Sequence, residues 1–197
     1  REATFQKYPA RLPAGAVRIL CERHVIMAKS KENKRKRYAA IDTGSNAVRL
    51  LIKELEWTPG GRFNEEVVAY YRVPLRLGSM VFNSGQLSTQ GIQNLIQVMQ
   101  AFKLLMNVQG VARFRACATS ALRTAENRSA VIQQVQDASG IEIELISGKE
   151  EADLILRNFK NNQWSKVSNL MCIDVGGGST ELSILKQGVC LARKSFK

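Results

Sequence analysis

The stretch IDVGGGSTE, residues 173–181, decides how the chain is interpreted. An apolar run, 170–175, leads into it, and a second run, 182–185, follows it. This order predicts two strands joined by a glycine turn. Because glycine has no Cβ, the consecutive residues Gly176, Gly177 and Gly178 let backbone N–H groups point at a ligand and approach it closely.

Polar side chains surround the three glycines. Ser179 and Thr180 supply hydroxyl donors, and Asp174 stands near the end of the first strand, where a carboxylate can hold a divalent cation. No Gly-Lys-Ser/Thr follows, so the stretch is not a Walker loop. A plain glycine-rich hairpin turn is the alternative. We interpret the stretch as a phosphate-binding hairpin.

An earlier segment repeats the same plan. A strand is predicted over 38–42, a Gly/Ser turn over 43–46, and a second strand over 47–55. Asp42 alone could bracket the turn through its side chain. Together with Asp174, it predicts two strand ends that close on one phosphate–metal site. Arg49 is either a surface residue or a phosphate contact, and spacing does not decide between them.

The net charge of +12 is unevenly distributed along the 197 residues. Residues 1–37 hold 11 basic and 3 acidic side chains, a net charge of +8, and the remainder has a net charge of +4. We therefore expect a basic, disordered leader over 1–37 and a mildly basic folded part over 38–197. The Lys/Arg run at 34–37 favours a solvated leader over specific nucleic-acid binding. The first methionine, Met27, is the expected native start.

Cysteine use and hydropathy suggest a compartment. The four cysteines are far apart and form no CxxC pair, and Cys117 and Cys172 lie in apolar runs. We expect buried, reduced thiols in a cytoplasmic protein. No apolar run approaches the roughly 18 residues that a membrane-spanning helix needs, so no membrane association is expected.

Between the two hairpins the pattern alternates between strands and helices. The predicted elements are a third strand over 67–77, a helix over 87–107, a strand over 114–118, a helix over 129–138, a strand over 141–146 and a helix from 147 to about 159. Such an α/β order predicts a sheet flanked by helices.

Two further groups stand at ends of predicted strands. Thr119 and Ser120 precede Arg123, so this segment either binds an anion or simply caps a helix. Glu150 and Glu151 begin the last helix, where acidic residues favour the helix dipole. Alternatively, one of them is a general base that activates water for attack on phosphorus.

Four runs together resemble the exopolyphosphatase/guanosine pentaphosphate phosphohydrolase family, which belongs to the actin/Hsp70/sugar-kinase superfamily. They are AAIDTGSNAVRLLI (39–52), ATSALRTAENR (118–128), ISGKEEADLIL (146–156) and CIDVGGGSTELSIL (172–185). The resemblance covers about 38–197 in one order. It implies a ribonuclease-H-like α/β lobe with a mixed five-stranded sheet flanked by helices, and it implies that a second actin-like lobe follows beyond Lys197.

The resemblance also implies roles for individual residues. The catalytic base falls on Glu151, with Arg123 beside it, and Mg²⁺ falls on Asp174, with Asp42 and Glu181 as further acids. Phosphate contacts fall on the following residues: Gly44, Ser45, Asn46, Thr119, Ser120, Gly176, Gly177, Gly178, Ser179 and Thr180.

The implied activity is hydrolysis of a terminal phosphoanhydride in polyphosphate or guanosine pentaphosphate by a homodimeric full-length protein. The motifs do not separate these two substrates. Asp153 departs from the pattern, because the family commonly has arginine two residues after the base. An ATP-dependent kinase or ATPase of the same superfamily is one alternative. An inactive alarmone- or polyphosphate-binding module and a basic nucleic-acid binder are others.

Overall fold

The computed structural model describes residues 35–58, 63–160, 168–178, 180–187 and 189–196. The predicted leader up to residue 34, the expected start at Met27 and the Pro-Gly-Gly turn at 59–61 lie outside these ranges. In chain order the elements are β1 (Arg35–Thr43), β2 (Val48–Trp57), β3 (Phe63–Val73), α2 (Leu77–Ser84), α3 (Thr89–Val108), β4 (Val111–Ala118), α4 (Ser120–Thr124), α5 (Arg128–Ser139), β5 (Ile143–Leu145), α6 (Gly148–Lys160), β6 (Asn169–Val175), β7 (Thr180–Lys186) and β8 (Val189–Phe196).

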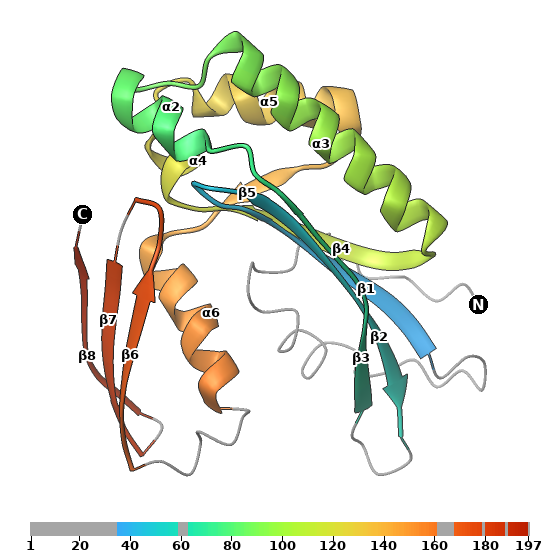
Figure 1. The fold of residues 1–197 in the computed structure, drawn as a ribbon. Helices are drawn as coiled ribbons and strands as arrows, with labels where there is room; N and C mark the ends of the chain where they lie inside the picture. Colours follow the sequence, from blue (N-terminus) through green and yellow to red (C-terminus); the bar gives the residue numbers. More distant parts are fainter. Residues whose placement is uncertain (1–34, 59–62, 161–167, 179, 188, 197) are drawn as a thin grey trace, which may run out of the picture.

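A mixed five-stranded sheet organises the first part of the molecule, as predicted. Its strand order is β3-β2-β1-β4-β5 (Figure 1). The first three strands form antiparallel hairpins, whereas β4 and β5 join parallel to β1. Parallel pairing needs crossover connections, and the helices α2–α5 supply them. This is the sheet of a ribonuclease-H-like lobe.

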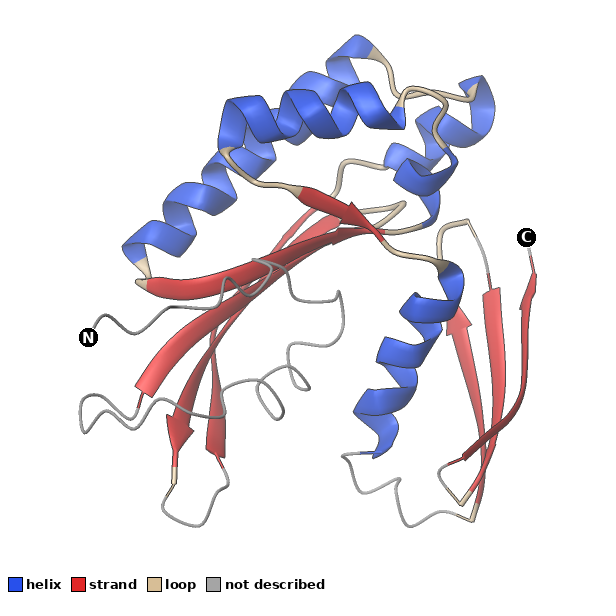
Figure 2. Ribbon diagram, turned by 180° about the vertical axis from the view of Figure 1, so that it is seen from behind, coloured by secondary structure: helices blue, strands red, loops and turns tan. Residues whose placement is uncertain are grey.

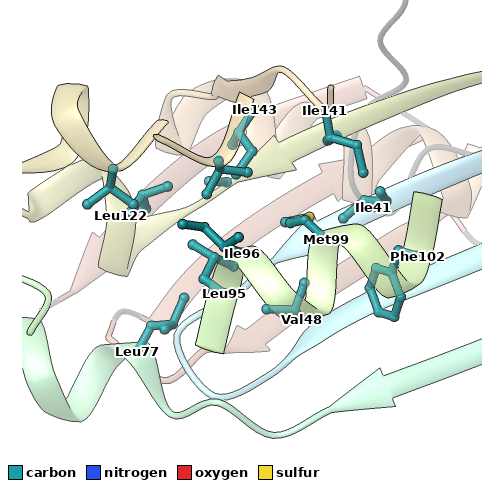
Figure 3. Packing of buried hydrophobic residues seen from close by; sticks show 14 of the residues in the cluster. Ile41, Val48, Leu77, Leu95, Ile96, Met99, Phe102, Leu122, Ile141 and Ile143 are labelled. Atoms are coloured by element: carbon teal, nitrogen blue, oxygen red, sulfur yellow. The ribbon is translucent and has the colours of Figure 1, made fainter. Parts of the chain in front are cut away.

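The main hydrophobic core lies between this sheet and the long helix α3 (Figure 3). Leu95, Met99 and Phe102 of α3 are almost fully buried, and they pack with Ile41 and Leu50 of the sheet. Their spacing of three to four residues places them on one face of the helix, as the sequence pattern predicts. Phe102 lies on the same face of the helix.

Local capping explains where the helices begin and end. Ser88 accepts a hydrogen bond from the Gly91 N–H at 3.1 Å, which caps the start of α3. Gly140 ends α5 in the left-handed conformation, with φ of 67°. In the part of the chain that the structure describes, none of the helices has the length and apolar character required to cross a membrane.

The predicted third strand is wrong at its C-terminal end. The strand β3 ends at Val73, and residues from Leu77 onward form the helix α2. Pro74 has no N–H for the sheet ladder, and Arg76 adopts a left-handed φ of 54°, so the chain turns here. Leu77 and Val81 are buried one helical turn apart, which is the helical signal that the prediction missed.

The boundary drawn at Tyr38 also needs correction. The first strand begins at Arg35, so the basic residues 35–37 belong to the sheet rather than to a leader. Arg35 pairs with Glu56 at 3.2 Å, and Arg37 pairs with Glu54 at 3.1 Å. Arg37 also donates to the carbonyl oxygen of Gln109 at 2.9 Å. Carboxylates on the neighbouring strand therefore neutralise much of this basic run.

The IDVGGGSTE hairpin belongs to a second sheet, which differs from the expected single lobe over 38–197. Strands β6, β7 and β8 form an antiparallel three-stranded sheet of their own. Both views place helix α6 between this sheet and the five-stranded one (Figure 2). Leu154 of α6 clusters with Cys117 and Ile146, whereas Ile155 packs against Cys172 and Leu185. Helix α6 thus contacts both sheets.

Candidate active site

The turn between β1 and β2 is tightly fixed by backbone hydrogen bonds. The Gly44 N–H donates to the Ala47 carbonyl at 3.1 Å. The carbonyls of Ser45 and Asn46 accept from the backbone N–H groups of Gly78 and Arg76, at 2.8 and 3.0 Å. The N-terminal end of α2 therefore supports the turn from one side. This leaves the side chains of Ser45 and Asn46 to face other parts of the site.

Hydroxyl groups from two segments meet beside this turn. The Oγ atoms of Ser45 and Ser120 lie 2.7 Å apart, and the Ser45 residue is buried. Thr119 donates its N–H to the Thr43 carbonyl at 3.2 Å, but its side chain makes no capping bond to α4. The Oγ1 atom of Thr43 is buried without a hydrogen-bond partner. The strand ends of β1 and β4 thus bring several hydroxyl groups together.

The glycine-rich loop of the second sheet reaches this turn directly. A Cβ atom at Gly177 would lie 2.9 Å from both Asn46 Nδ2 and Ser45 Cβ. A Cβ atom at Gly178 would lie 3.1 Å from Ser120 Oγ and would collide with the Phe82 ring. Such close approaches require glycine. The two predicted phosphate hairpins therefore meet, as the sequence predicts, with Thr180 beginning β7 and Ser179 outside the described residues.

The strands of the two hairpins carry three acidic side chains, Asp42, Asp174 and Glu181. Asp42 accepts a hydrogen bond from Arg49 Nη1 at 2.7 Å, so Arg49 is paired with an acid of the candidate site. Asp174 stands opposite Glu181 in the register of β6 and β7, and Glu181 is 6% exposed. Burial raises the pKa of Asp42; Arg49 opposes this shift, and Asp174 adds to it. Burial and then Glu181 raise the pKa of Asp174. These carboxylates therefore repel one another.

Such a set of oxygens suits Mg²⁺, but the carboxylates do not form a compact cage. In the described ranges, no group of three or more His, Cys, Asp or Glu side chains is close enough to hold a metal ion. Mg²⁺ is commonly held by only one or two carboxylates, with water and substrate phosphate completing its shell. The donor chemistry fits this mode of binding, so the metal site stays a prediction.

Glu151 lies in the first turn of α6, beside Arg123. Its Oε2 atom is 3.4 Å from Arg123 Nη1, which also donates to the Ile146 carbonyl at 2.8 Å. Burial raises the pKa of Glu151 to about 6; Arg123 opposes this shift, whereas Glu181 and Asp42 add to it. The carboxylate is therefore close enough to the acids of both sheets to sense their charge. A carboxyl with this pKa is suited to accept a proton near neutral pH.

The neighbouring acids of α6 have other partners. Glu150 pairs with Arg115 at 3.0 Å, and Arg115 also pairs with Glu144 at 2.7 Å. Asp153 pairs with Arg193 of β8 at 2.9 Å. The sequence left a choice between two glutamates: Glu151 contacts Arg123 and is influenced by the charges of Asp42 and Glu181, whereas Glu150 contacts Arg115. The departure at Asp153 is compensated by the charge of Arg193.

Sequence reasoning missed one group at this site. Phe82 lies against the positions of Gly78 and Gly178, between the first turn and the glycine loop. It belongs to α2, which the sequence interpretation had assigned partly to a strand. The apolar spacing of Leu77 and Val81 would have indicated the helix that carries Phe82.

This fold is an α/β lobe of the actin/Hsp70/sugar-kinase superfamily, with the convergent hairpins at one end of its five-stranded sheet. The model of the Ppx/GppA phosphatase family matches residues 62–197. The chain belongs to that family. The match covers the segments that contribute Ser120, Arg123, Glu151 and the glycine loop.

Curated relatives and solved structures agree with this assignment. The chain is 30% identical over 147 residues to exopolyphosphatase 1 of Mycobacterium bovis, covering 75% of the chain and 42% of the relative. It is 31% identical over 153 residues to exopolyphosphatase 2 of Mycobacterium tuberculosis, covering 74% and 47%. The chain therefore spans less than half the length of these relatives.

Two crystal structures are similar over most of the chain. An exopolyphosphatase from Cytophaga hutchinsonii superposes with a TM-score of 0.72 at 25% identity, covering 82% of this chain and 50% of that one. The Ppx/GppA family member of Aquifex aeolicus superposes with a TM-score of 0.69 at 28% identity, covering 82% and 51%.

Proposed function

We propose that the protein hydrolyses a terminal phosphoanhydride bond and releases orthophosphate from inorganic polyphosphate or guanosine pentaphosphate. The observation that supports this most is the convergence of two glycine turns with Glu151 and Arg123. The named relatives, which are exopolyphosphatases, support polyphosphate as one substrate. Guanosine pentaphosphate rests on the family resemblance alone.

In this proposal Glu151 accepts a proton from the attacking water. Its raised pKa of about 6 leaves it mostly ionised at neutral pH, yet basic enough to take the proton. Arg123 lies at 3.4 Å from that carboxylate and holds it toward the hairpins. The same guanidinium would balance charge that develops on the transferred phosphoryl oxygens.

The two turns would bind the phosphate oxygens. Backbone N–H groups of the loop 176–178 and the hydroxyls of Ser45 and Ser120 are donors of the required type. Asp42 and Asp174, with Glu181 beside them, are the residues that would hold Mg²⁺. When bound, the ion would neutralise charge on the phosphate oxygens. Most of the catalysis would then come from positioning and electrostatics.

We further propose a cytoplasmic, homodimeric protein that binds no specific nucleic acid. Cys117 and Cys172 are buried and are not in a disulfide within the described part of the chain, which suits a reducing compartment. Much of the basic run at 35–37 is ion-paired within the sheet, which argues against its use for nucleic acid.

The test measures phosphate release from long-chain polyphosphate and from guanosine pentaphosphate, with Mg²⁺ and with a chelator. We expect Mg²⁺-dependent release that Glu151→Gln abolishes while substrate binding persists. Glu150→Gln is the matched control, because that residue pairs with Arg115 instead, and it should retain most of the activity.

Near-normal release by Glu151→Gln would contradict the assignment of the base. No release from either substrate in a folded sample would contradict the proposed hydrolysis. Release of phosphate from ATP alone would favour an ATPase or kinase of the same superfamily.

A further inference from the structure

Arg193 of β8 contacts two groups of α6 that lie on either side of Glu151 in the sequence. Its Nη1 donates to the Lys149 carbonyl oxygen at 3.2 Å. Its Nη2 donates to Asp153 Oδ1 at 2.9 Å. The guanidinium thus spans the first turns of the helix on which the proposed base stands.

This contact is more constrained than an ordinary surface ion pair. The side chain of Arg193 is only 21% exposed, and its buried Nε atom has no hydrogen-bond partner among the residues that the structure describes. The planar guanidinium donates in fixed directions, so two acceptors on one helix define how that helix lies. An ion pair to an exposed carboxylate adds little stability by itself. The contact therefore matters more for the position of α6 than for the stability of the protein.

A second arginine holds the same turn from the other sheet. Arg115 of β4 pairs with Glu150, which directly precedes Glu151. Helix α6 lies between the two sheets (Figures 1 and 2). Each sheet contributes one arginine to the first turns of α6. The apolar anchors of α6, Leu154 and Ile155, come later in the helix. These apolar side chains hold the middle of α6, whereas polar contacts hold its first turn.

The three-stranded sheet also carries two of the acids of the candidate site. Asp174 and Glu181 stand on β6 and β7, and Ser183 of β7 is the register partner of Arg193. A shift of α6 relative to this sheet would change the distance between Glu151 and the glycine loop. Displacement of a reacting group by about 1 Å can cost roughly 100-fold in rate.

We propose that Arg193 is a positioning residue, which holds the first turns of α6 against β8 and so sets where Glu151 stands relative to the glycine loop. This inference rests on the proposed hydrolysis, because it assigns Glu151 the role of base. Arg193 does not touch the reacting atoms in this assignment. Its loss should lower kcat and leave the KM for polyphosphate nearly unchanged.

The experiment compares Arg193→Gln, Asp153→Asn and the exchanged pair Asp153→Arg/Arg193→Asp with the unaltered protein. We expect Arg193→Gln to lower kcat by roughly 10- to 100-fold, the range found when a reacting group loses its orientation. Asp153→Asn should have a smaller effect, since the Lys149 carbonyl still accepts. The exchanged pair should recover part of the loss.

Lys194→Gln is the matched control. It removes a positive charge from the next residue of β8, whose ammonium lies over the Phe196 ring instead of against α6. The control should keep kcat within about twofold of the unaltered protein, because surface substitutions of this kind rarely change the structure. Amide hydrogen exchange of residues 148–155 is the second readout; Arg193→Gln should accelerate it, and Lys194→Gln should not.

Each outcome decides between the alternatives. An unchanged kcat in Arg193→Gln would overturn the inference, and a raised KM with unchanged kcat would assign Arg193 to substrate binding instead. If the unaltered protein releases no phosphate, the proposed hydrolysis fails. Amide hydrogen exchange then tests the inference by itself. Unaltered hydrogen exchange in Arg193→Gln would overturn the proposed positioning of α6 by Arg193, and faster hydrogen exchange would support it.

Discussion

Arg123 Nη1 lies 3.4 Å from Glu151 Oε2 and 2.8 Å from the carbonyl oxygen of Ile146. The shorter bond anchors the guanidinium to the chain that leads into α6, and the longer contact directs it at the carboxylate. Arg123 therefore links the helix α4 to the start of α6.

Substitution of Arg123 by alanine should lower kcat by about 100-fold, the order reported for loss of one group that stabilises developing charge. Arg123 lowers the pKa of Glu151, so its removal should also move the acidic limb of the pH profile to higher pH. Steady-state kinetics from pH 5 to 8 would measure both effects. Arg128→Ala is the control, because that guanidinium donates to the nearby Ala125 carbonyl oxygen at 3.2 Å. An acidic limb that stays in place would contradict the contact with Glu151.

The proposed hydrolysis should depend on the ionisation of Glu151. Because burial raises its pKa to about 6, the carboxylate needed to accept a proton forms as the pH rises through this value. We expect kcat/KM, which reports the protein without substrate, to increase from pH 5 to 7 with a midpoint near 6. A profile that is flat over this range would show that another group, or another step, limits turnover.

Glu151→Gln should stabilise the fold at neutral pH although it removes the proposed base. The pKa of the carboxyl is raised from 4.5 to about 6, so the folded state binds the proton more tightly than the unfolded chain does. Its contribution to stability is thus complete below pH 4.5 and is lost as the pH rises through about 6. The loss corresponds to about 2 kcal/mol.

Urea unfolding of Glu151→Gln and of the unaltered protein at pH 4 and pH 7 would check this sign. We expect the variant to be more stable at pH 7 and the difference to shrink at pH 4. A variant that is less stable at pH 7 would mean that the pair with Arg123 outweighs the cost of burying the charge.

Gly177→Ala should impair the site without unfolding the five-stranded sheet. Its Cβ would lie 2.9 Å from Asn46 Nδ2 and from Ser45 Cβ, so the loop must move away from the turn. We expect a raised KM for polyphosphate and a lower kcat, with an unchanged far-ultraviolet spectrum. Gly148→Ala is the control, because its Cβ would meet Arg123 Nη2 only at 3.9 Å. Equal kinetics in Gly177→Ala and the unaltered protein would argue that the two turns separate during turnover.

Phe102→Ala should destabilise the protein by about 3–5 kcal/mol, because it empties space in the core between α3 and the sheet. Leu104→Ala, two residues later on the same helix, should change stability by less than about 0.5 kcal/mol, since Leu104 is 65% exposed. The midpoint of thermal unfolding measures both. Comparable losses at the two positions would contradict the assigned buried face of α3.

The two hairpins and the long helix could be predicted because their signals are local. Strict apolar spacing identified α3, and the glycine-containing turns that follow Asp42 and Asp174 identified β1–β2 and β6–β7. Arg35 illustrates what local signals miss. Its charge suggests a solvated leader, but in the structure it lies in β1 and pairs with Glu56 on the neighbouring strand. The helix α2 was missed because the strand-like run was extended through Pro74 to Leu77. The left-handed conformation of Arg76, where the chain turns, is not visible in the sequence.

The candidate site was predictable in its residues and less so in its partners. Spacing alone left Glu150 and Glu151 as alternatives, and only the family resemblance placed the base on Glu151. The partner of Glu150, Arg115, lies on another strand and could not be predicted. The approach of Gly177 to Asn46 joins two sheets, and no local pattern specifies it. Asp153 could be recognised as unusual in sequence, but its partner Arg193 lies on a strand far along the chain.

The meeting of Gly177 with the turn at Asn46 has a consequence for synthesis. The five-stranded sheet is complete once residue 145 has been made, and it contains its own core, so it can fold on the ribosome while the last motif is still missing. The glycine loop closes a long stretch of chain, which is an entropically costly late event. A nascent or prematurely terminated chain would therefore possess a folded sheet and the base on α6 but no closed site for a polyanion. The order of the motifs along the chain thus delays the formation of the complete site until the last of them has been synthesised.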